Sequence, residues 1–250
     1  MMKDGKMVSD NYGRLTSIAL DPIEKKPLNH FHPGSMILSV GSYGCSFNCP
    51  FCQNHEISMP SEYLSYRNVS PEELAALAND LKDRGNIGVA YTYNEPLISY
   101  EYVRDCAKLI HEKGMYNVLV TNGCASLEVL KEISSYIDAM NIDLKSFDEK
   151  HYRDVLGGDL DMVKAFISEA VKTAHVEIMT LIIPGINDSD EDIREMASWI
   201  ASLDRDIPYH LSRFFPAYKM KDKRPTPVET VYHLKDVASE YLKNVYTGNC

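Results

Sequence analysis

Three cysteines stand close together in the first part of the chain, in the run Gly-Cys-Ser-Phe-Asn-Cys-Pro-Phe-Cys that contains Cys45, Cys49 and Cys52. Gly44 and Pro50 favour a tight curl of the backbone, so the three sulfurs can turn toward one point. Thiolates are ligands that soft metal centres prefer. A 4Fe–4S cube usually takes four cysteines, so a loop that offers three leaves one iron open to a cofactor or substrate.

Two other readings of this loop stay open. A structural zinc ion could use the three cysteines and His55, although zinc ligands usually come as two separated pairs. A disulfide framework is also conceivable, but three cysteines cannot pair off among themselves, and the chain has only six in 250 residues. Cys106, Cys124 and Cys250 lie apart from the loop and do not suffice for a second cluster.

Composition limits the class of protein. An apolar content of 44% in 250 residues is enough for one α/β domain with a proper core. The net charge of −10 and the pI near 5.3 disfavour nucleic acid or an anionic membrane as the main partner. No apolar run approaches the roughly 18 residues of a spanning helix, and the start does not resemble a secretory signal. We therefore expect a cytoplasmic protein, in an anaerobic or microaerobic host because such a cluster is oxygen-sensitive.

The elements that must position the loop alternate between strand and helix with a period of roughly 30 residues. The predicted strands cover residues 36–40, 87–93, 116–120, 139–144, 175–183 and 209–215, and the predicted helices cover residues 70–84, 98–113, 126–136, 150–155, 161–172, 189–203 and 227–243. Because each crossover carries a helix, the strands should be parallel and wrap into a partial (βα)6 barrel. Residues 35–250 form this single domain, and residues 1–34 an N-terminal extension packed on it. In that extension residues 14–20 are expected as a strand, and two prolines predict a loop over 21–28.

Polar clusters follow the predicted strands at their carboxyl ends, where barrels of parallel strands carry their sites. The strand over 139–144 is the most informative, because Asn141, Asp143 and Lys145 give it one polar face. A polar face in a buried strand needs charge partners or a ligand, since an unpaired buried ion is costly. An internal pair between Asp143 and Lys145 without any ligand is the alternative. Glu177 and His210 are weaker candidates for the same cavity.

The spacing Cys-x3-Cys-x-aromatic-Cys, with Phe51 as the aromatic residue, resembles the radical S-adenosylmethionine (SAM) superfamily. Together with the strand ends, it resembles the pyruvate formate-lyase activating enzymes. The residues of several motifs are similar to those of the prokaryotic AmmeMemoRadiSam branch. The resemblance implies a 4Fe–4S cluster whose open iron binds SAM, and reductive cleavage to methionine and a 5′-deoxyadenosyl radical that abstracts hydrogen. It implies an electron donor such as flavodoxin or ferredoxin, and a glycyl-radical enzyme as substrate. A small molecule or peptide is the alternative substrate, and a non-catalytic zinc- or cluster-stabilised binding protein is a third hypothesis.

The resemblance also assigns roles to individual residues. The family's Gly-Gly-Glu-Pro segment matches residues 93–96, where both glycines are replaced and Glu95 remains as the expected contact of the SAM amino group. The family's Asp-Thr-Asn-Gly matches residues 120–123 without the acid, and its Asp-Leu-Lys matches residues 143–145, where Lys145 would pair with a carboxylate. The predicted cluster ligands are Cys45, Cys49 and Cys52, and the predicted cofactor-binding residues are Phe51, Asn94, Glu95, Thr121, Asn122, Asp143, Lys145, Glu177 and His210.

Overall fold

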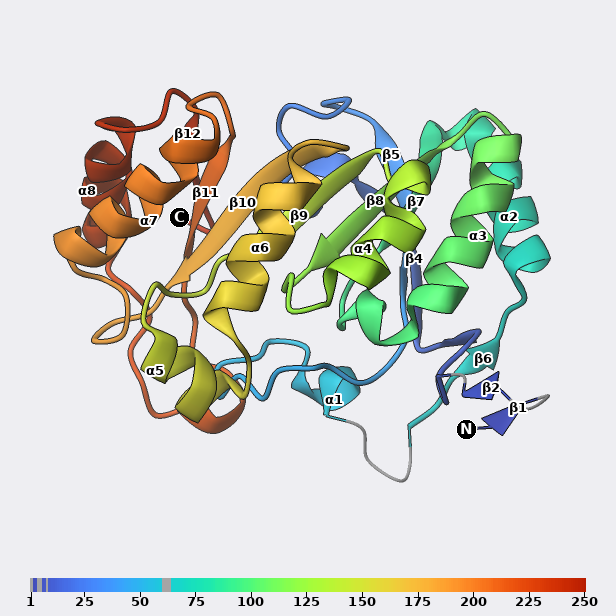
Figure 1. The fold of residues 1–250 in the computed structure, drawn as a ribbon, viewed down its shortest axis with the longest axis horizontal. Helices are drawn as coiled ribbons and strands as arrows, with labels where there is room; N and C mark the ends of the chain where they lie inside the picture. The colour runs from blue at the N-terminus through green and yellow to red at the C-terminus, as the bar shows by residue number, and fades with distance from the viewer. Residues whose placement is uncertain (1, 4–5, 8, 60–63) are drawn as a thin grey trace.

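A curved sheet organises the chain in the computed structural model, which describes residues 2–3, 6–7, 9–59 and 64–250 (Figure 1). Its strands lie in the order β12-β11-β10-β9-β8-β7-β5-β4. They are β4 (Ser17–Pro22), β5 (Met36–Gly41), β7 (Asn86–Tyr91), β8 (Tyr116–Thr121), β9 (Ala139–Asp143), β10 (His175–Ile182), β11 (Tyr209–Arg213) and β12 (Val245–Gly248). All neighbouring pairs are parallel except β4 with β5.

Helices connect the parallel strands and cover the outer face of the sheet (Figure 1). They are α2 (Pro71–Asp80), α3 (Tyr100–Glu112), α4 (Leu127–Ile133), α6 (Leu160–Ala170), α7 (Asp190–Leu203) and α8 (Val228–Ser239), with the short α1 (His55–Ser58) and α5 (Glu149–His151) near the cysteine loop. Single turns occur at η1 (Ile23–Lys25), η2 (Lys82–Arg84), η3 (Pro96–Ser99), η4 (Ser134–Tyr136), η5 (Tyr152–Leu156) and η6 (Tyr218–Met220). Two small antiparallel pairs, β1 (Met2–Lys3) with β2 (Lys6–Met7) and β3 (Arg14–Leu15) with β6 (Arg67–Asn68), lie outside the main sheet.

The six predicted strands are confirmed as β5, β7, β8, β9, β10 and β11, in the expected parallel order. The start of α2 is also as predicted. The Ser70 hydroxyl accepts a hydrogen bond from the Glu73 amide at 3.2 Å, while the Glu73 carboxylate accepts one from the Ser70 amide at 2.8 Å. This capping box satisfies amide groups that a helix start leaves without partners. Local sequence therefore fixes where the first crossover helix begins.

Two parts of the sheet differ from the prediction. The expected loop over 21–28 is wrong at its start, because Asp21 and Pro22 are the last residues of β4. A proline is tolerated there because β4 is an edge strand. On its outer side no neighbouring strand needs a hydrogen bond from the backbone amide that proline lacks. β12 was not predicted, and it adds a parallel strand beyond β11. The extension before residue 35 thus supplies part of the sheet itself.

The apolar core lies between the sheet and its helices, as the two faces of β9 illustrate. Met140 and Ile142 are fully buried in the main hydrophobic cluster together with helix residues such as Phe166. Burial of each such side chain stabilises the fold by roughly 1.5–3 kcal/mol. On the other face, Asn141 and Asp143 line a cavity inside the curve of the sheet. Among the described residues, none of the helices combines the length and the apolar character needed to cross a membrane.

Candidate active site at the strand ends

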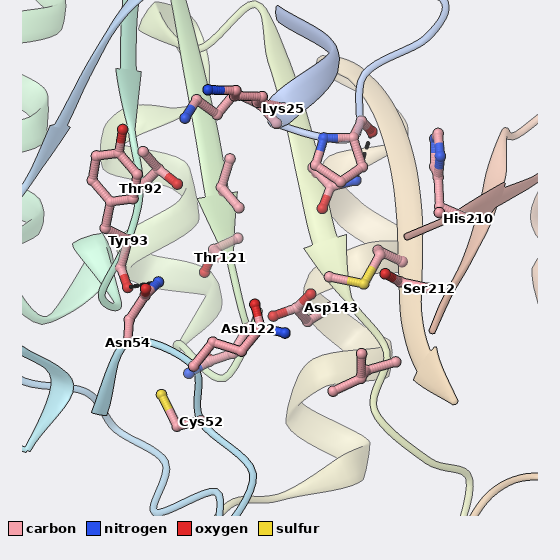
Figure 2. A pocket seen from close by; sticks show the side chains of 18 of the residues that line it. Lys25, Cys52, Asn54, Thr92, Tyr93, Thr121, Asn122, Asp143, His210 and Ser212 are labelled. Carbon is pink, nitrogen blue, oxygen red and sulfur yellow. Dashed lines mark hydrogen bonds between the residues drawn. The ribbon is translucent and has the colours of Figure 1, made fainter. Parts of the chain in front are cut away.

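The concave side of the sheet encloses a cavity of about 700 Å³. One end is formed by the cysteine loop and the carboxyl ends of β7, β8 and β9, and the other by residues 22–29, which cross the opposite end of the barrel. Figure 2 shows Cys52, Asn122 and Asp143 toward the first end and Lys25 toward the second. We call the first the cysteine end and the second the floor. All predicted site residues except Glu177 line this cavity.

The cysteine loop has the tight curl that its sequence predicts. Gly44 has a φ of 88°, and a Cβ at this position would lie 2.8 Å from the Ile98 side chain, so only glycine fits without strain. The Cys52 amide donates to the Cys49 carbonyl at 3.2 Å and so closes the turn. Cys45, Cys49 and Cys52 all line the cavity, and all six cysteines of the chain are free thiols.

Burial of the thiols sets a condition on any metal centre that they hold. Burial raises the pKa of Cys45 to about 12 and the pKa of Cys49 to about 11, so both stay protonated until a cation replaces the proton. In the part of the chain that the structure describes, no three His, Cys, Asp or Glu side chains converge closely enough for one metal ion. A zinc ion draws its ligands to about 2.0–2.3 Å, whereas a cube spreads its thiolates over separate irons.

Glu95 ties the ends of β7 and β8 together. Its carboxylate accepts hydrogen bonds from the Thr121 hydroxyl at 2.7 Å, the Asn122 amide at 2.8 Å and the Leu97 amide at 3.0 Å. Burial raises the pKa of Glu95 to about 7, although these three bonds act in the opposite direction. The Asn122 side chain in turn donates to the Ser46 hydroxyl at 3.0 Å. Three of the predicted cofactor contacts therefore form one network behind the cysteine loop.

Residues 93 and 94 show how the chain manages without the glycines of the related motif. Tyr93 has a φ of 71°, in the left-handed region that a glycine adopts without cost. Its carbonyl accepts a hydrogen bond from the Asn54 side chain at 2.8 Å, which Figure 2 shows. Asn94 supports the cysteine loop, since its side chain accepts from the Ser42 amide at 2.9 Å and donates to the Gly44 carbonyl at 3.1 Å. These contacts hold the strained backbone in place.

Asp143 and Lys145 form an ion pair at the centre of the cysteine end, with Nζ and Oδ2 2.8 Å apart. Although burial lowers the pKa of Lys145, the Asp143 carboxylate outweighs it, so the lysine stays protonated. The other carboxylate oxygen of Asp143, Oδ1, is buried and has no hydrogen-bond partner. The Lys145 ammonium also lies 6.0 Å from the centre of the buried Phe51 ring. The pair is therefore internal, as the ligand-free alternative expected, but it leaves one acceptor free for a ligand.

Glu177 takes a different position from the one predicted, because it is absent from the lining of the cavity. Its fully buried carboxylate accepts from the Asn29 and His30 amides at 3.0 and 2.7 Å, and it lies 3.0 Å from His175 and 2.6 Å from His210. Burial raises the pKa of Glu177, but these bonds outweigh it and lower the pKa to about 2. Glu177 fastens the floor to the sheet, while His210 does face the cavity, as predicted.

The floor contains polar residues that the sequence analysis did not single out. Asp21 accepts a hydrogen bond from the Tyr93 hydroxyl at 2.6 Å and pairs with the buried Lys26 at 2.9 Å and with Lys25 at 3.2 Å. Although burial raises the pKa of Asp21, these partners hold it well below its usual range. The charged residues among positions 21–26 were visible in the sequence, but a sequence gives no sign that this segment meets Tyr93 in the loop after β7.

Asn141 completes the floor on the side of β9. Its side-chain amide group donates to the Pro27 carbonyl at 2.9 Å, which fixes the orientation of the side chain. The remaining oxygen, Oδ1, is buried without a partner, although the side chain is fully shielded from solvent. The sequence indicated a cavity-facing position for Asn141, because this residue belongs to the polar face of the strand over 139–144. Cys124, in contrast, lies outside the cavity, with its sulfur 3.7 Å from that of Met162.

The class of protein follows from a partial barrel with three cysteines and polar strand ends around one cavity. The family model described as the Radical SAM superfamily matches residues 39–200. The chain belongs to the radical SAM superfamily, whose members use a 4Fe–4S cluster and SAM.

Relatives of known sequence narrow the comparison. The chain is 40% identical over 251 residues to the uncharacterized protein MJ0808 of Methanocaldococcus jannaschii, covering 98% of this chain and 73% of that protein. It is 29% identical over 180 residues to the pyruvate formate-lyase-activating enzyme of Clostridium pasteurianum, covering 67% of this chain and 72% of that enzyme. The chain is therefore similar to an activating enzyme at modest identity.

Solved structures share the fold. Streptococcus suis SuiB bound to S-adenosylmethionine matches with a TM-score of 0.62 and 16% identity, over 86% of this chain and 49% of that one. A domain of the pyruvate-formate lyase-activating enzyme from Bacteroides vulgatus matches with a TM-score of 0.57 and 21% identity, over 65% of this chain and 99% of that one. These likenesses establish the radical SAM fold of this chain.

Proposed function

We propose that Cys45, Cys49 and Cys52 hold a 4Fe–4S cluster through three of its irons, and that SAM binds at the fourth. The observation that carries the proposal is that these cysteines line one cavity with the polar ends of β7, β8 and β9. When bound, the cluster supplies the electron that cleaves SAM to methionine and a 5′-deoxyadenosyl radical. The tasks of the chain itself are to hold SAM, orient it and exclude water.

The charges at the cysteine end match the two charged groups of the methionine part of SAM. Asp143 offers its free Oδ1 to the ammonium group, and Glu95 is the second carboxyl group that lines this end of the cavity. Lys145 offers a positive charge to the carboxylate. Because these side chains are fixed by their neighbours before any ligand binds, little ordering is needed when SAM enters.

The substrate that the relatives favour is a glycine of a partner protein. In this reaction the radical takes one hydrogen atom from the glycine Cα, which leaves 5′-deoxyadenosine and a glycyl radical. The support is the similarity to the pyruvate formate-lyase-activating enzyme of Clostridium pasteurianum. A reduced carrier of the flavodoxin or ferredoxin type is the electron donor in this proposal.

A second candidate is a small molecule or peptide held inside the barrel. The observation that favours it is the floor, which closes the cavity with polar groups of Lys26, Asn29, Asn141 and His210. The unpartnered oxygen of Asn141 is an acceptor that a donor group of a bound substrate could satisfy. Polar groups beyond the SAM site are expected for a substrate that enters the cavity completely.

The class of reaction is tested by anaerobic reconstitution with iron and sulfide, reduction with dithionite and chromatography of 5′-deoxyadenosine. We expect the product from the native chain and none from Cys45→Ala, Cys49→Ala or Cys52→Ala, together with a loss of bound iron. Cys124→Ala and Cys250→Ala are matched controls, because these thiols lie outside the cavity. Both control variants should keep the bound iron and the formation of 5′-deoxyadenosine. Full retention of product in any of the three loop variants refutes the ligand role of that cysteine.

The two substrates are distinguished by electron paramagnetic resonance. The reduced protein is mixed with SAM and a glycyl-radical enzyme, and the spectrum is recorded under argon. A doublet from coupling to the remaining Cα hydrogen supports activation of a protein partner. Production of 5′-deoxyadenosine without any such signal across the glycyl-radical enzymes of the host favours the small-molecule or peptide substrate.

A further inference from the structure

A short basic segment lies next to the cysteine loop. Residues 218–224, which we call the basic loop, carry four cations and one carboxylate, in a chain whose net charge is −10. The cations are Lys219, Lys221, Lys223 and Arg224, and all four are exposed. The ion pairs found in the described part of the chain involve other residues. These positive charges are therefore available to a partner.

The basic loop is fastened to the cysteine loop itself. The Lys219 amide donates to the carbonyl of Pro50, which lies between Cys49 and Cys52, at 3.0 Å. The Tyr218 ring stacks on His55 with ring centres 4.6 Å apart. Tyr218 has a φ of 48°, in the left-handed region that favours glycine, and these two contacts help to hold it. In Figure 1 the orange segment after β11 accordingly lies beside the light-blue chain that leads into α1.

The surroundings make this loop the favourable place for a negatively charged partner. On the other flank of the cysteine loop, where the Asn48 amide donates to the Leu156 carbonyl at 2.7 Å, the exposed charges of residues 148–154 are of both signs. The chain as a whole carries a net charge of −10, so its overall field disfavours an acidic partner wherever positive charge is not concentrated. Charges of opposite sign at one patch raise the rate of encounter and fix its orientation.

We propose that the basic loop docks the acidic surface of a small one-electron carrier protein of the flavodoxin or ferredoxin type. This inference rests on the proposed function, which requires one electron for each SAM cleaved. In the docked pair the reduced carrier loses one electron and the cluster gains it, and no atom is transferred. The exposed Phe215, three residues before the basic loop, adds apolar contact area. Weak redox complexes bury less than about 1,200 Å² in total, so only a small docking surface is required of the chain.

Charge reversal of the basic loop tests the proposal. The full-length reconstituted protein is compared with the variant Lys219→Glu, Lys221→Glu, Lys223→Glu and Arg224→Glu for binding to an acidic flavodoxin and an acidic ferredoxin by biolayer interferometry. At low salt we expect association to slow by about tenfold or more. The difference should shrink at high ionic strength, because salt screens exposed charges.

The matched control reverses four exposed cations at the opposite end of the strands: Lys82, Arg84, Lys113 and Lys172 follow the carboxyl ends of α2, α3 and α6. This variant should bind the carrier nearly as the native chain does. Formation of 5′-deoxyadenosine with dithionite should be unchanged in both variants, since a chemical reductant needs no docking surface. With the protein carrier as the only reductant, the rate should fall in the basic-loop variant alone.

Three results would each overturn the proposal. They are no binding of either carrier to the native chain, an unchanged association rate in the basic-loop variant, or an equal fall in association rate in the basic-loop variant and the control variant. If the reversed variant does not fold, the same four positions are changed to glutamine, which should lower association by a smaller factor. Failure of the proposed function is distinguishable, because it would abolish dithionite-driven product in the native chain while the binding measurement still reports on docking.

Discussion

The two ends of the cavity use charged side chains in different ways. At the floor, the Glu177 carboxylate has four hydrogen-bonded neighbours, and the Asp21 carboxylate has three. At the cysteine end, Asp143 has one ionic partner and a buried oxygen with none. A buried polar atom without a partner costs about 1–3 kcal/mol, so it persists where a ligand supplies the missing bond.

The difference separates structural charges from functional ones. The floor charges connect segments that are distant in sequence, since Glu177 in β10 bonds the amides of residues 29 and 30. At the cysteine end, the charge of Asp143 is held in place but incompletely satisfied. Removing a floor charge should therefore reduce stability, whereas removing the charge of Asp143 should reduce cofactor affinity.

The largest effect on stability is expected from Glu177→Ala. The substitution leaves two backbone amides and two histidines without their buried acceptor, so we expect a loss of about 3–5 kcal/mol in the free energy of unfolding. Urea denaturation of the protein measures it. Thr180→Ala in the same strand is a useful reference, because it removes a buried hydroxyl that bonds the Leu144 carbonyl but carries no charge. A loss for Glu177→Ala no larger than the reference would contradict the structural role.

A smaller effect, on binding instead of stability, is expected from Asp143→Asn. This change keeps the size of the side chain and removes the charge that we assign to the SAM ammonium group. SAM affinity should fall roughly 10- to 100-fold, as for the loss of a hydrogen bond to a charged group. Isothermal titration of the anaerobic reconstituted protein measures it. Asn141→Asp, on the same face of β9, serves as a comparison. Unaltered affinity in Asp143→Asn would remove Asp143 from the SAM site.

The smallest effect is a pH dependence at the floor. The pKa of Glu177 is lowered to about 2 from an ordinary value of 4.5, so the unfolded chain binds this proton more readily than the folded one. The stability that this carboxylate contributes is complete above pH 4.5 and is lost as the pH falls toward 2. The native chain and Glu177→Gln differ in their free energy of unfolding. This difference should therefore become smaller by about 1 kcal/mol or more as the pH falls from 6 to 3. A difference that stays constant would mean that the bonds to Glu177 do not favour its ionised form.

Much of the cysteine end could be predicted from the sequence because its signals are local. The curl around Gly44 depends on neighbouring residues, and the alternation over 139–144 directs Asp143 to one face of β9. The capping box at Ser70 and Glu73 likewise involves residues three apart. The positions of Phe51, Asn94, Thr121 and Asn122 along the cavity follow from the rule that parallel strands carry their sites at one end.

The floor could not be predicted in the same way. Glu177 has the spacing of a cavity residue, yet the segment at Asn29 and His30 covers it, and that segment lies almost 150 positions earlier in the chain. Asp21 was assigned to a loop because of the prolines, while pairing with β5 makes it part of a strand. Only the folded chain decides which distant backbone groups reach a carboxylate.

The sequence by itself determined the cysteine spacing, the parallel barrel and the polar strand ends, because each depends on contacts within a few residues or on the regular geometry of strands. The tertiary structure alone decided that Glu177 and Asp21 close the floor, that Tyr93 adopts a left-handed conformation against Asn54, and that the basic loop rests on Pro50. The reason is physical: these contacts join segments whose separation along the chain carries no information about their distance in the fold.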